Sequence, residues 1–229
     1  MTDTCYDPTD YPPFAVTADV VVITVRDGKA MVLAHKRDGN PHAGRRALPG
    51  TFIAPDEDAE ATALRALTVK AGIALGVGHL EQLATYSAPD RDPRMRVVSV
   101  AHVALVPDPG DPPMGEWTEP DTDGWAFDHA TVVADGMERA RAKIEYTGLA
   151  ASLAGETFTL TDLSDVYEAL WGHAPGYSAF RRKVLAADGF VEETGETRPA
   201  NKDGSGRPTK LYRAGKGTTL HPPITRDTT

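Results

Sequence analysis

The order of apolar and polar positions divides the chain into strand-like and helix-like segments. Two β-branched runs joined by "RDGK" occupy residues 15–37, and Asp27-Gly28 supplies the residue types that a tight hairpin turn requires. Helical spacing of apolar positions over 56–72 predicts a helix capped by Asp56 or Asp58, and a dense β-branched run at 94–108 predicts a strand. The breaker-rich stretch 107–124 predicts a loop and no core element. These elements together predict an α+β domain.

A second pattern begins near residue 155. Residues 127–156 have a helical pattern that predicts one helix running from the first domain into the next, and two short helices then follow in succession. Thr159 or Thr161 caps the first of these helices. Its expected apolar face consists of Leu163, Val166, Leu170 and Trp171. The second helix, at about 178–187, is expected to bury Phe180, Val184 and Leu185 and to leave Arg181, Arg182 and Lys183 largely outward.

Two short strands around the polar loop 197–208 complete the second pattern. A helix, a turn, a helix and then a hairpin make a winged helix-turn-helix. The sequence therefore predicts two domains, 1–154 and 155–229. We expect disorder at both chain ends, before about Asp10 and after about Gly215, so the second domain carries a flexible C-terminal tail.

Charge and cysteine content limit the classes of function. The 24 basic and 33 acidic residues give a net charge of −9, which by itself argues against a polyanionic partner. However, residues 156–229 contain 10 basic and 10 acidic residues, so the excess negative charge lies in the first domain. The single cysteine, Cys5, excludes an intrachain disulfide framework and fits a reducing, cytoplasmic setting. We find no export signal and no membrane span.

The helical segment 56–72 carries the most specific motif. Residues 48–73 resemble the Nudix box, with the spacing kept at Glu57, Arg65, Gly72 and Ile73. The first glycine of the box falls on Thr51, and its later glutamates fall on Ala66, Val69 and Lys70. Nudix hydrolases hold divalent cations with those glutamates, and the cations neutralise a diphosphate and activate water. The resemblance therefore implies a Nudix fold with a mixed sheet, without catalytic residues and without a metal site.

A degenerate Nudix domain followed by a winged helix resembles the NrtR family of Nudix-related transcriptional regulators. The resemblance covers nearly the whole chain, including "RAKIEYTGLA", "FTLTDLSDVYEALWG" and "GRPTKLYR". It implies a homodimeric repressor of genes for NAD synthesis or salvage, which leaves a palindromic operator in double-stranded DNA when ADP-ribose or a related nucleotide binds. It implies no cofactor and no membrane partner. Three alternatives stay open: a related regulator that senses a sugar metabolite, a Nudix-type hydrolase with an atypical metal site, and a scaffold that does not bind DNA.

The effector site is expected in the nucleotide cleft of the first domain, where paired arginines suit a diphosphate. The residues assigned to it are Arg37, Phe52, Glu57, Tyr86, Arg91 and Arg94. The five histidines of this domain have no metal-ligand spacing and are expected to be structural or surface residues. They are His35, His42, His79, His102 and His129. Trp117 and Trp125 are expected to serve local packing.

The DNA-binding surface is expected on the second short helix and on the wing. Residues 181–216 contain nine basic and five acidic residues, a local excess of positive charge that suits a polyanion. The helix would present its outward side chains to the major groove, and the wing would reach phosphates or the minor groove. The residues assigned to this surface are Tyr177, Ser178, Arg181, Arg182 and Lys183 on the helix, and Lys202, Arg207 and Lys210 on the wing.

Overall fold

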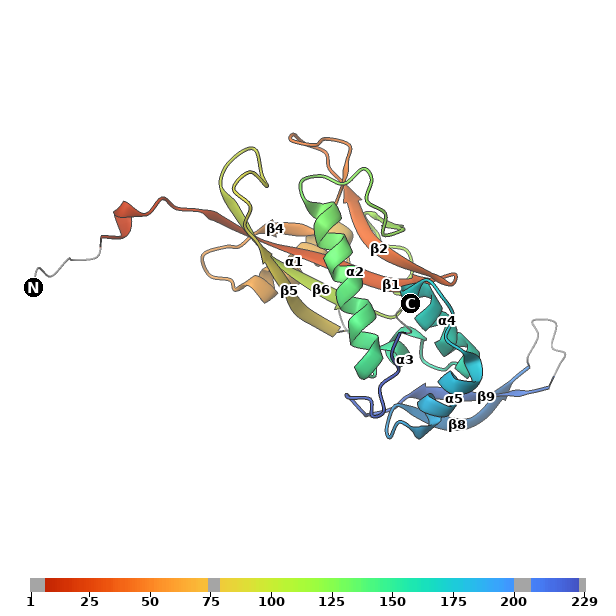
Figure 1. The fold of residues 1–229 in the computed structure, drawn as a ribbon. Helices are drawn as coiled ribbons and strands as arrows, with labels where there is room; N and C mark the ends of the chain where they lie inside the picture. The colour runs from red at the N-terminus through yellow and green to blue at the C-terminus, as the bar shows by residue number, and fades with distance from the viewer. Residues whose placement is uncertain (1–6, 74–78, 200–206, 227–229) are drawn as a thin grey trace, which may run out of the picture.

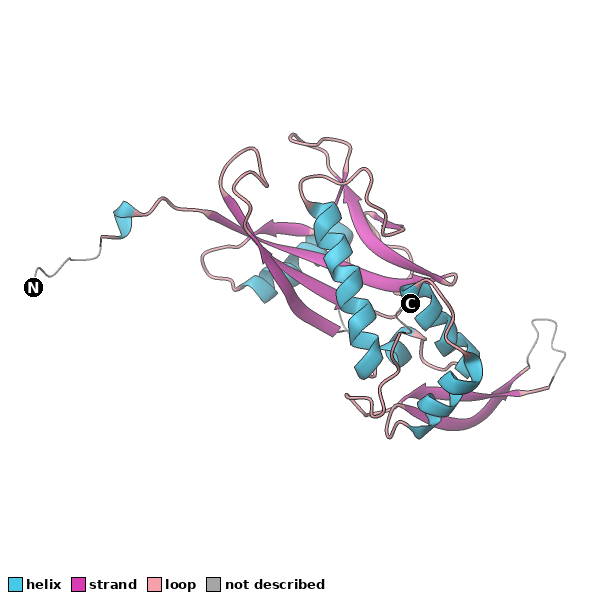
Figure 2. Ribbon diagram, viewed as in Figure 1, coloured by secondary structure: helices cyan, strands magenta, loops and turns pink. Residues whose placement is uncertain are grey.

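A computed structural model describes residues 7–73, 79–199 and 207–226 of the chain. Its first part is a mixed sheet with a helix on each face, and its second part is a small helical domain with a two-stranded wing (Figures 1 and 2). The order of strands in the sheet is β3-β2-β1-β6-β5, with β4 also paired to β1 and β7 also paired to β2. In the part of the chain described, no helix is long and apolar enough to cross a membrane.

The sheet is built around its two longest strands, β1 (Ala15–Arg26) and β6 (Val97–Leu105), which run parallel. The shorter strands and the helix on one face complete this domain. They are β2 (Lys29–Lys36), β3 (Arg46–Ala47), β4 (Gly50–Phe52), β5 (His79–Tyr86), β7 (Glu116–Thr118) and α1 (Ala59–Ala71), with a short 3-10 helix at Pro8–Asp10 before β1.

The predicted β-hairpin is confirmed, and its turn explains the choice of residues. Asp27 and Gly28 have φ values of 50° and 73°, so both lie in the left-handed region that a two-residue hairpin turn of type I′ requires. Alternate residues of β1 then point to opposite faces of the sheet. Val20 belongs to the cluster under α1, whereas Val21 belongs to the cluster under α2 (His129–Tyr146). The close approach of α2 depends on Gly136, because a Cβ there would lie 2.9 Å from Val21 Cγ1.

The predicted winged helix is also confirmed. Its elements are α3 (Leu149–Leu153), α4 (Leu160–Trp171), α5 (Tyr177–Ala186), β8 (Val191–Arg198) and β9 (Thr209–Ala214). Thr159, and not Thr161, caps α4: its side chain accepts from Asp162 N while Asp162 accepts from Thr159 N. The core under α2 continues through α3 and α4 to Phe180 of α5, so the two parts share one apolar cluster.

Four sequence predictions about the fold were wrong. The loop 107–124 contains β7, which pairs with β2 and joins the sheet. The single helix expected over 127–156 is broken, because Thr147 is extended and separates α2 from α3. Leu185 is 48% exposed and does not belong to the core. The tail expected to be disordered is packed over residues 215–226, where Leu220 and Ile224 are buried.

Candidate functional site: a cationic pocket and an exposed helix

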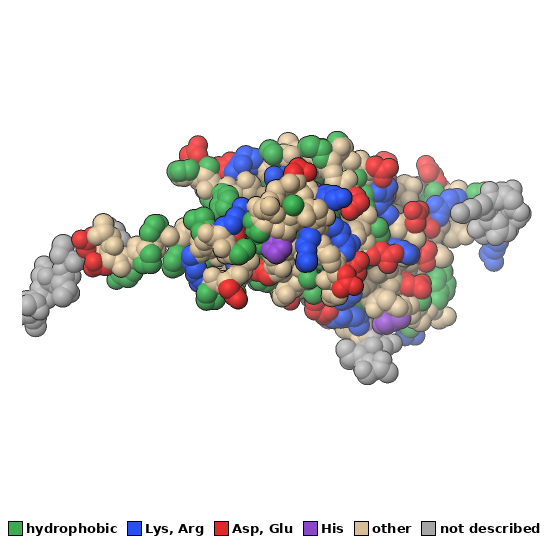
Figure 3. All heavy atoms as spheres, turned by 90° about the horizontal axis from the view of Figure 1, so that it is seen from above, with side chains coloured by type: hydrophobic (Ala, Val, Ile, Leu, Met, Phe, Trp, Pro, Cys, Tyr) green, Lys and Arg blue, Asp and Glu red, His purple; other side chains and the backbone are tan. Residues whose placement is uncertain are grey.

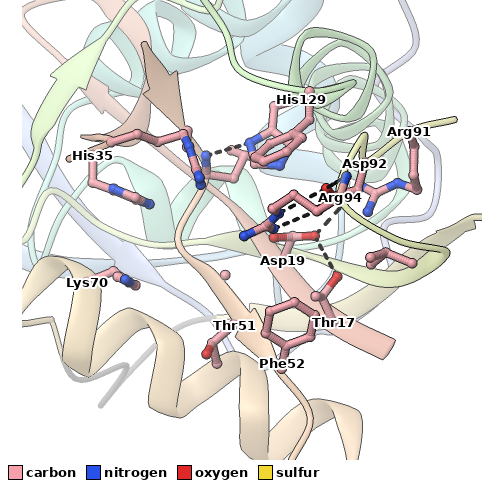
Figure 4. A pocket seen from close by; sticks show the side chains of 16 residues that line it. Thr17, Asp19, His35, Thr51, Phe52, Lys70, Arg91, Asp92, Arg94 and His129 are labelled. Carbon is pink, nitrogen blue, oxygen red and sulfur yellow. Dashed lines mark hydrogen bonds and ion pairs between the residues drawn. The ribbon is translucent and has the colours of Figure 1, made fainter. Parts of the chain in front are cut away.

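A pocket of about 290 Å³ opens between β1, β4, the C-terminal end of α1 and the loops before β6 and α2 (Figure 4). Four of the six residues assigned to the effector site line it: Arg37, Phe52, Arg91 and Arg94. Further side chains that line it are Thr17, Asp19, His35, Leu48, Thr51, Lys70, Asp92, Phe127 and His129. Four cations and two carboxylates therefore surround the space, and this excess of positive charge suits an anion.

Glu57 was assigned to the effector site, but it does not line this pocket. Its carboxylate accepts from Arg65 Nε at 2.7 Å and Nη2 at 2.6 Å, and from Thr62 Oγ1 at 2.9 Å. These hydrogen bonds, first those of Arg65 and then that of Thr62, lower the pKa of Glu57 to about 2. The two residues that match the Nudix pattern, Glu57 and Arg65, thus form an ion pair that joins the loop before α1 to the helix.

The positions of the missing glutamates do not form a metal site. Ala66 is buried, Val69 is exposed, and Lys70 brings a positive charge to the pocket where a cation would bind. No group of three or more His, Cys, Asp or Glu side chains that could hold a metal ion occurs in residues 7–73, 79–199 and 207–226. The divalent cations of a Nudix hydrolase therefore do not fit the ligands that the described residues offer.

The two arginines assigned to a diphosphate are each held by an aspartate. Buried Arg91 donates to Asp128 from Nε at 2.9 Å and from Nη2 at 2.7 Å. Arg94 donates to Asp92 from Nε at 3.0 Å and from Nη2 at 2.7 Å. These bidentate pairs fix the arginines in the pocket wall and offset much of their charge. Only part of each guanidinium remains available to a ligand.

Arg37 and Lys70 differ from those arginines, because no ion pair with a carboxylate occurs for either in the described part of the chain. Arg37 donates from Nε to Pro41 O at 2.9 Å, and its guanidinium lies 4.7 Å from the centre of the Phe127 ring. Burial, and then the charge of Arg94, lowers the pKa of Arg37. An anion in the pocket would oppose both effects, because an opposite charge favours the charged form of the guanidinium.

The inner wall of the pocket contains a buried polar group that the sequence did not reveal. Asp19 is 7% exposed and accepts hydrogen bonds from Ser99 and Thr17. His129 is also buried, and its Nδ1 accepts from Leu48 N at 2.9 Å, so the proton of the neutral ring is on Nε2. Burial lowers the pKa of His129, which keeps the ring neutral.

His129 and His35 were expected to be structural or surface residues, yet both line the pocket. No spacing in the sequence marks them, because they come from the start of α2 and from β2, which only the tertiary fold brings together. Tyr86 is the opposite case. It was assigned to the effector site, but it lies outside the pocket and donates to Asp135 at 2.7 Å. Burial and this hydrogen bond raise its pKa.

The two tryptophans pack locally, as expected. Trp117 donates from Nε1 to Gly110 O at 2.8 Å, and Trp125 donates from Nε1 to Asp121 O at 2.9 Å. Trp125 is buried, and Arg46 lies over its ring.

The expected DNA-binding helix, α5, presents part of the predicted surface. Tyr177, Ser178, Arg181 and Arg182 lie together on one shallow depression at the surface, whose remaining lining is Leu185 and Ala186. Arg181 and Arg182 are exposed, and Lys183 is half-buried on another side of the helix. Lys183 is therefore separate from this face, although it remains a predicted contact. This face lies on the outer side of α5, whereas Phe180 and Val184 on the inner side are buried in the core.

Acidic side chains hold several cations of the wing. Lys210 pairs with Glu193 at 2.8 Å and Arg213 pairs with Glu192 at 2.8 Å, both across the β8–β9 ladder. Arg207 is exposed, and the assigned residue Lys202 lies outside the described residues. Figure 3 shows acidic and basic side chains interspersed over the face in that view. Among the described residues, Arg181 and Arg182 of α5 are exposed cations without a carboxylate partner, in contrast to Lys210 and Arg213.

The fold is a mixed sheet with a cationic pocket, of the Nudix kind, joined to a winged-helix domain. Comparison with known families gives the same division, because residues 13–146 match the model of the NUDIX domain and residues 150–214 match the NrtR DNA-binding winged helix domain. The chain belongs to the NrtR family of Nudix-related transcriptional regulators. It is 34% identical over 219 residues to the ADPR responsive transcriptional repressor NtrR of Acinetobacter baylyi, a match that covers 91% of this chain and 85% of that protein.

Solved structures support the same relationship. Shewanella oneidensis NrtR in complex with a 27mer DNA is 31% identical, with a TM-score of 0.73 over 87% of this chain and 93% of that chain. The NUDIX domain of the same protein in complex with ADP ribose is 30% identical, with a TM-score of 0.51 over 61% of this chain and 99% of that chain. The predicted α+β fold, with a Nudix domain followed by a winged helix, is confirmed.

Proposed function

We propose that this protein is a cytoplasmic repressor of genes for NAD synthesis or salvage, and that ADP-ribose or a closely related nucleotide releases it from DNA. The observation that carries the proposal is the cationic pocket of a Nudix domain that lacks metal ligands, joined to a helix with a free basic face. The relatives named above, one responsive to ADP-ribose and one solved with DNA, support both parts.

In this proposal the pocket binds the nucleotide without cleaving it. Arg37 and Lys70 contact the diphosphate, because their charges have no carboxylate partner among the described residues. Phe52, which is 43% exposed at the rim, offers a ring on which a base can stack. Asp19 and the Nε2–H of His129 are an acceptor and a donor suited to ribose hydroxyls. Arg91 and Arg94 hold the wall in shape through their aspartates.

The DNA-binding part of the proposal assigns base contacts to α5 and phosphate contacts to the wing. Arg181 and Arg182 are the side chains suited to guanine edges, and Tyr177 and Ser178 accompany them on the same face. Arg207, Lys210 and Lys202 of the wing and Lys183 of α5 are proposed as phosphate contacts. A homodimer presents two such helices, so we propose a palindromic operator read by two copies of the chain.

The test is a binding experiment in three arms. Duplexes selected from a random pool by the purified protein would supply the operator, and its Kd would then be measured with increasing ADP-ribose, ADP or sugar phosphates. We expect ADP-ribose to weaken DNA binding about five- to 150-fold, the usual range of coupling between two sites. A response to sugar phosphates alone would redirect the proposal to sugar metabolism, and failure to select any duplex would overturn it. Steady release of AMP from ADP-ribose would instead identify a hydrolase.

A further inference from the structure

Helix α2 begins at the effector pocket and ends at the winged helix. His129, its first residue, lines the pocket, and its cap residue Asp128 holds the guanidinium of Arg91. With 18 residues, α2 is about 27 Å long at 1.5 Å per residue. A single helix therefore spans the distance from the pocket to the winged-helix domain.

The C-terminal end of α2 is fixed by segments outside it. The last four carbonyls of a helix have no partner within the helix. In α2 these carbonyls accept from Thr147 N and Oγ1, from Tyr167 Oη of α4, and from the backbone N–H groups of Ile224 and Leu220, at 2.7 to 3.0 Å. Two of these five bonds thus come from the segment that contains Leu220 and Ile224, and this segment caps α2.

We define residues 215–226 as the strap. In Figure 1 this dark blue segment leaves the wing and returns past α3 to α2. Leu220 and Ile224 are buried in the shared core. Arg226 then donates to two carboxylates of α2, to Glu145 from Nε at 3.0 Å and to Glu138 from Nη1 at 3.3 Å as well as from Nη2. Arg226 therefore ties the end of the strap along two turns of α2.

The other end of the strap contacts the segment that follows the recognition helix α5. Gly215 N donates to Phe190 O and Gly217 N donates to Gly189 O, both at 2.8 Å. The backbones lie too close for side chains here, because a Cβ at Gly215 would lie 2.0 Å from Gly189 O. The strap thus joins the end of α2 directly to the segment between α5 and β8. This connection is separate from the packing of α4 on α2.

We propose that the strap transmits the state of the effector pocket to the recognition helix, and that Arg226 is its positioning residue. The inference rests on the proposed function, since it explains how nucleotide binding changes the fit of α5 to DNA. A shift at the first turn of α2 moves the last turn, and the strap moves the α5–β8 segment with it. Without the Arg226 side chain the strap loses its guanidinium contacts with Glu138 and Glu145 and is held to α2 through Leu220 and Ile224, so the two sites keep their ligands but communicate less.

The experiment measures three quantities in the full-length protein: the Kd for ADP-ribose, the Kd for the selected duplex, and the factor by which ADP-ribose weakens duplex binding. For Arg226→Ala we expect both Kd values to stay within about threefold of wild type. The coupling factor should fall about two- to 30-fold, the range for residues that carry coupling without touching either ligand. Arg226→Lys keeps the charge but not the two-pronged contact, and should give an intermediate factor.

Arg26→Ala is the matched control. Arg26 also pairs with two acids, Asp108 and Asp111, and its side chain is 24% exposed against 25% for Arg226. Its acidic partners belong to the loop after β6 and not to α2 or the strap, so its coupling factor should equal that of wild type. An unchanged factor in Arg226→Ala would overturn the inference and leave the proposed function intact. Absence of coupling in the wild type would overturn both, and an equal fall in both variants with the same loss of Tm would show a merely structural role.

Discussion

Replacing Arg37 by alanine tests whether the pocket binds its nucleotide by charges of the protein alone. Arg37 is half-buried, its guanidinium lies 4.7 Å from the centre of the Phe127 ring, and it has no carboxylate partner among the described residues. Arg37→Ala removes one charge-assisted hydrogen bond to a diphosphate, which is worth about 1.5–3 kcal/mol. The Kd for ADP-ribose should therefore rise about ten- to 150-fold.

Lys70 supplies an internal comparison, because it faces the same pocket but is exposed to solvent. Two charges 4 Å apart attract by about 1 kcal/mol in water and about 4 kcal/mol near a protein surface of lower dielectric. Because Lys70 is exposed to solvent, the free energy lost in Lys70→Ala should be near the lower value, and the Kd for ADP-ribose should rise only about fivefold. A larger loss from Lys70→Ala than from Arg37→Ala would contradict the argument from burial.

Isothermal titration calorimetry of ADP-ribose in EDTA at neutral pH measures these effects without a divalent cation. Arg45→Ala is the control, since Arg45 lies on the same loop but outside the lining of the pocket. Its Kd should match that of wild type. The Kd of wild type should also rise more steeply with salt than that of Arg37→Ala, because the variant has one charge fewer to screen. A change of less than twofold for Arg37→Ala would refute the assignment.

Three further outcomes follow from the sites. ADP-ribose should bind equally well with EDTA or magnesium and release no AMP, as calorimetry and chromatography of the products would check, because no carboxylate cluster holds a metal in the described ranges. Arg181→Ala or Arg182→Ala should weaken operator binding by roughly 1–3 kcal/mol if the contact is to a base edge. For a phosphate contact, the slope of the operator affinity against salt concentration should instead fall by about one. Gel shifts that show no loss of binding in either variant would remove α5 from the DNA interface. The Glu57–Arg65 pair should stabilise the fold above pH 4.5 and progressively less as the pH falls to about 2, because the pKa of Glu57 is lower in the folded state than in the unfolded state. The Tm of Glu57→Gln should therefore lie below the Tm of wild type at neutral pH and approach it near pH 2.

The elements that the sequence predicted correctly are those fixed by neighbouring residues. The hairpin depends on Asp27-Gly28, whose backbone conformation is a local property of those two residues. The ends of α1 depend on Asp58 and Gly72, which cap it by local hydrogen bonds and by a left-handed φ of 68°. α4 begins at Thr159 for the same kind of reason. In each case the signal lies within a few residues of the feature.

The elements that the sequence missed are fixed by distant partners. β7 is a strand because β2 offers it an edge, although Gly and Pro surround it. The strap is ordered because the terminal carbonyls of α2 and the acids Glu138 and Glu145 hold it. Neither partner is visible in the local sequence, whose polar residues and breakers are typical of loops. In β7 and in the strap, contacts with distant residues therefore determine the structure, although the local sequence is typical of a loop.

The site was predicted by residue type, and the fold adds which of its charged side chains are paired. Two arginines near a cleft suggested a diphosphate site, but Asp128 and Asp92 hold Arg91 and Arg94. Within the described part of the chain, the pocket cations without a carboxylate partner are Arg37, directly after β2, and Lys70. A sequence shows how many charges a site contains, but only the fold shows which of them are already neutralised.

Lys70 explains why the altered Nudix box suits a sensor. In a Nudix hydrolase, acids at these positions hold cations that neutralise a diphosphate and also activate water. An ammonium at Lys70 can supply the first of these effects, because it brings positive charge to the same wall of the pocket. It cannot supply the second, because it has no open coordination position at which water would lose a proton. A chain that exchanges the metal for its own cations can therefore keep affinity for the diphosphate while losing the means to cleave it.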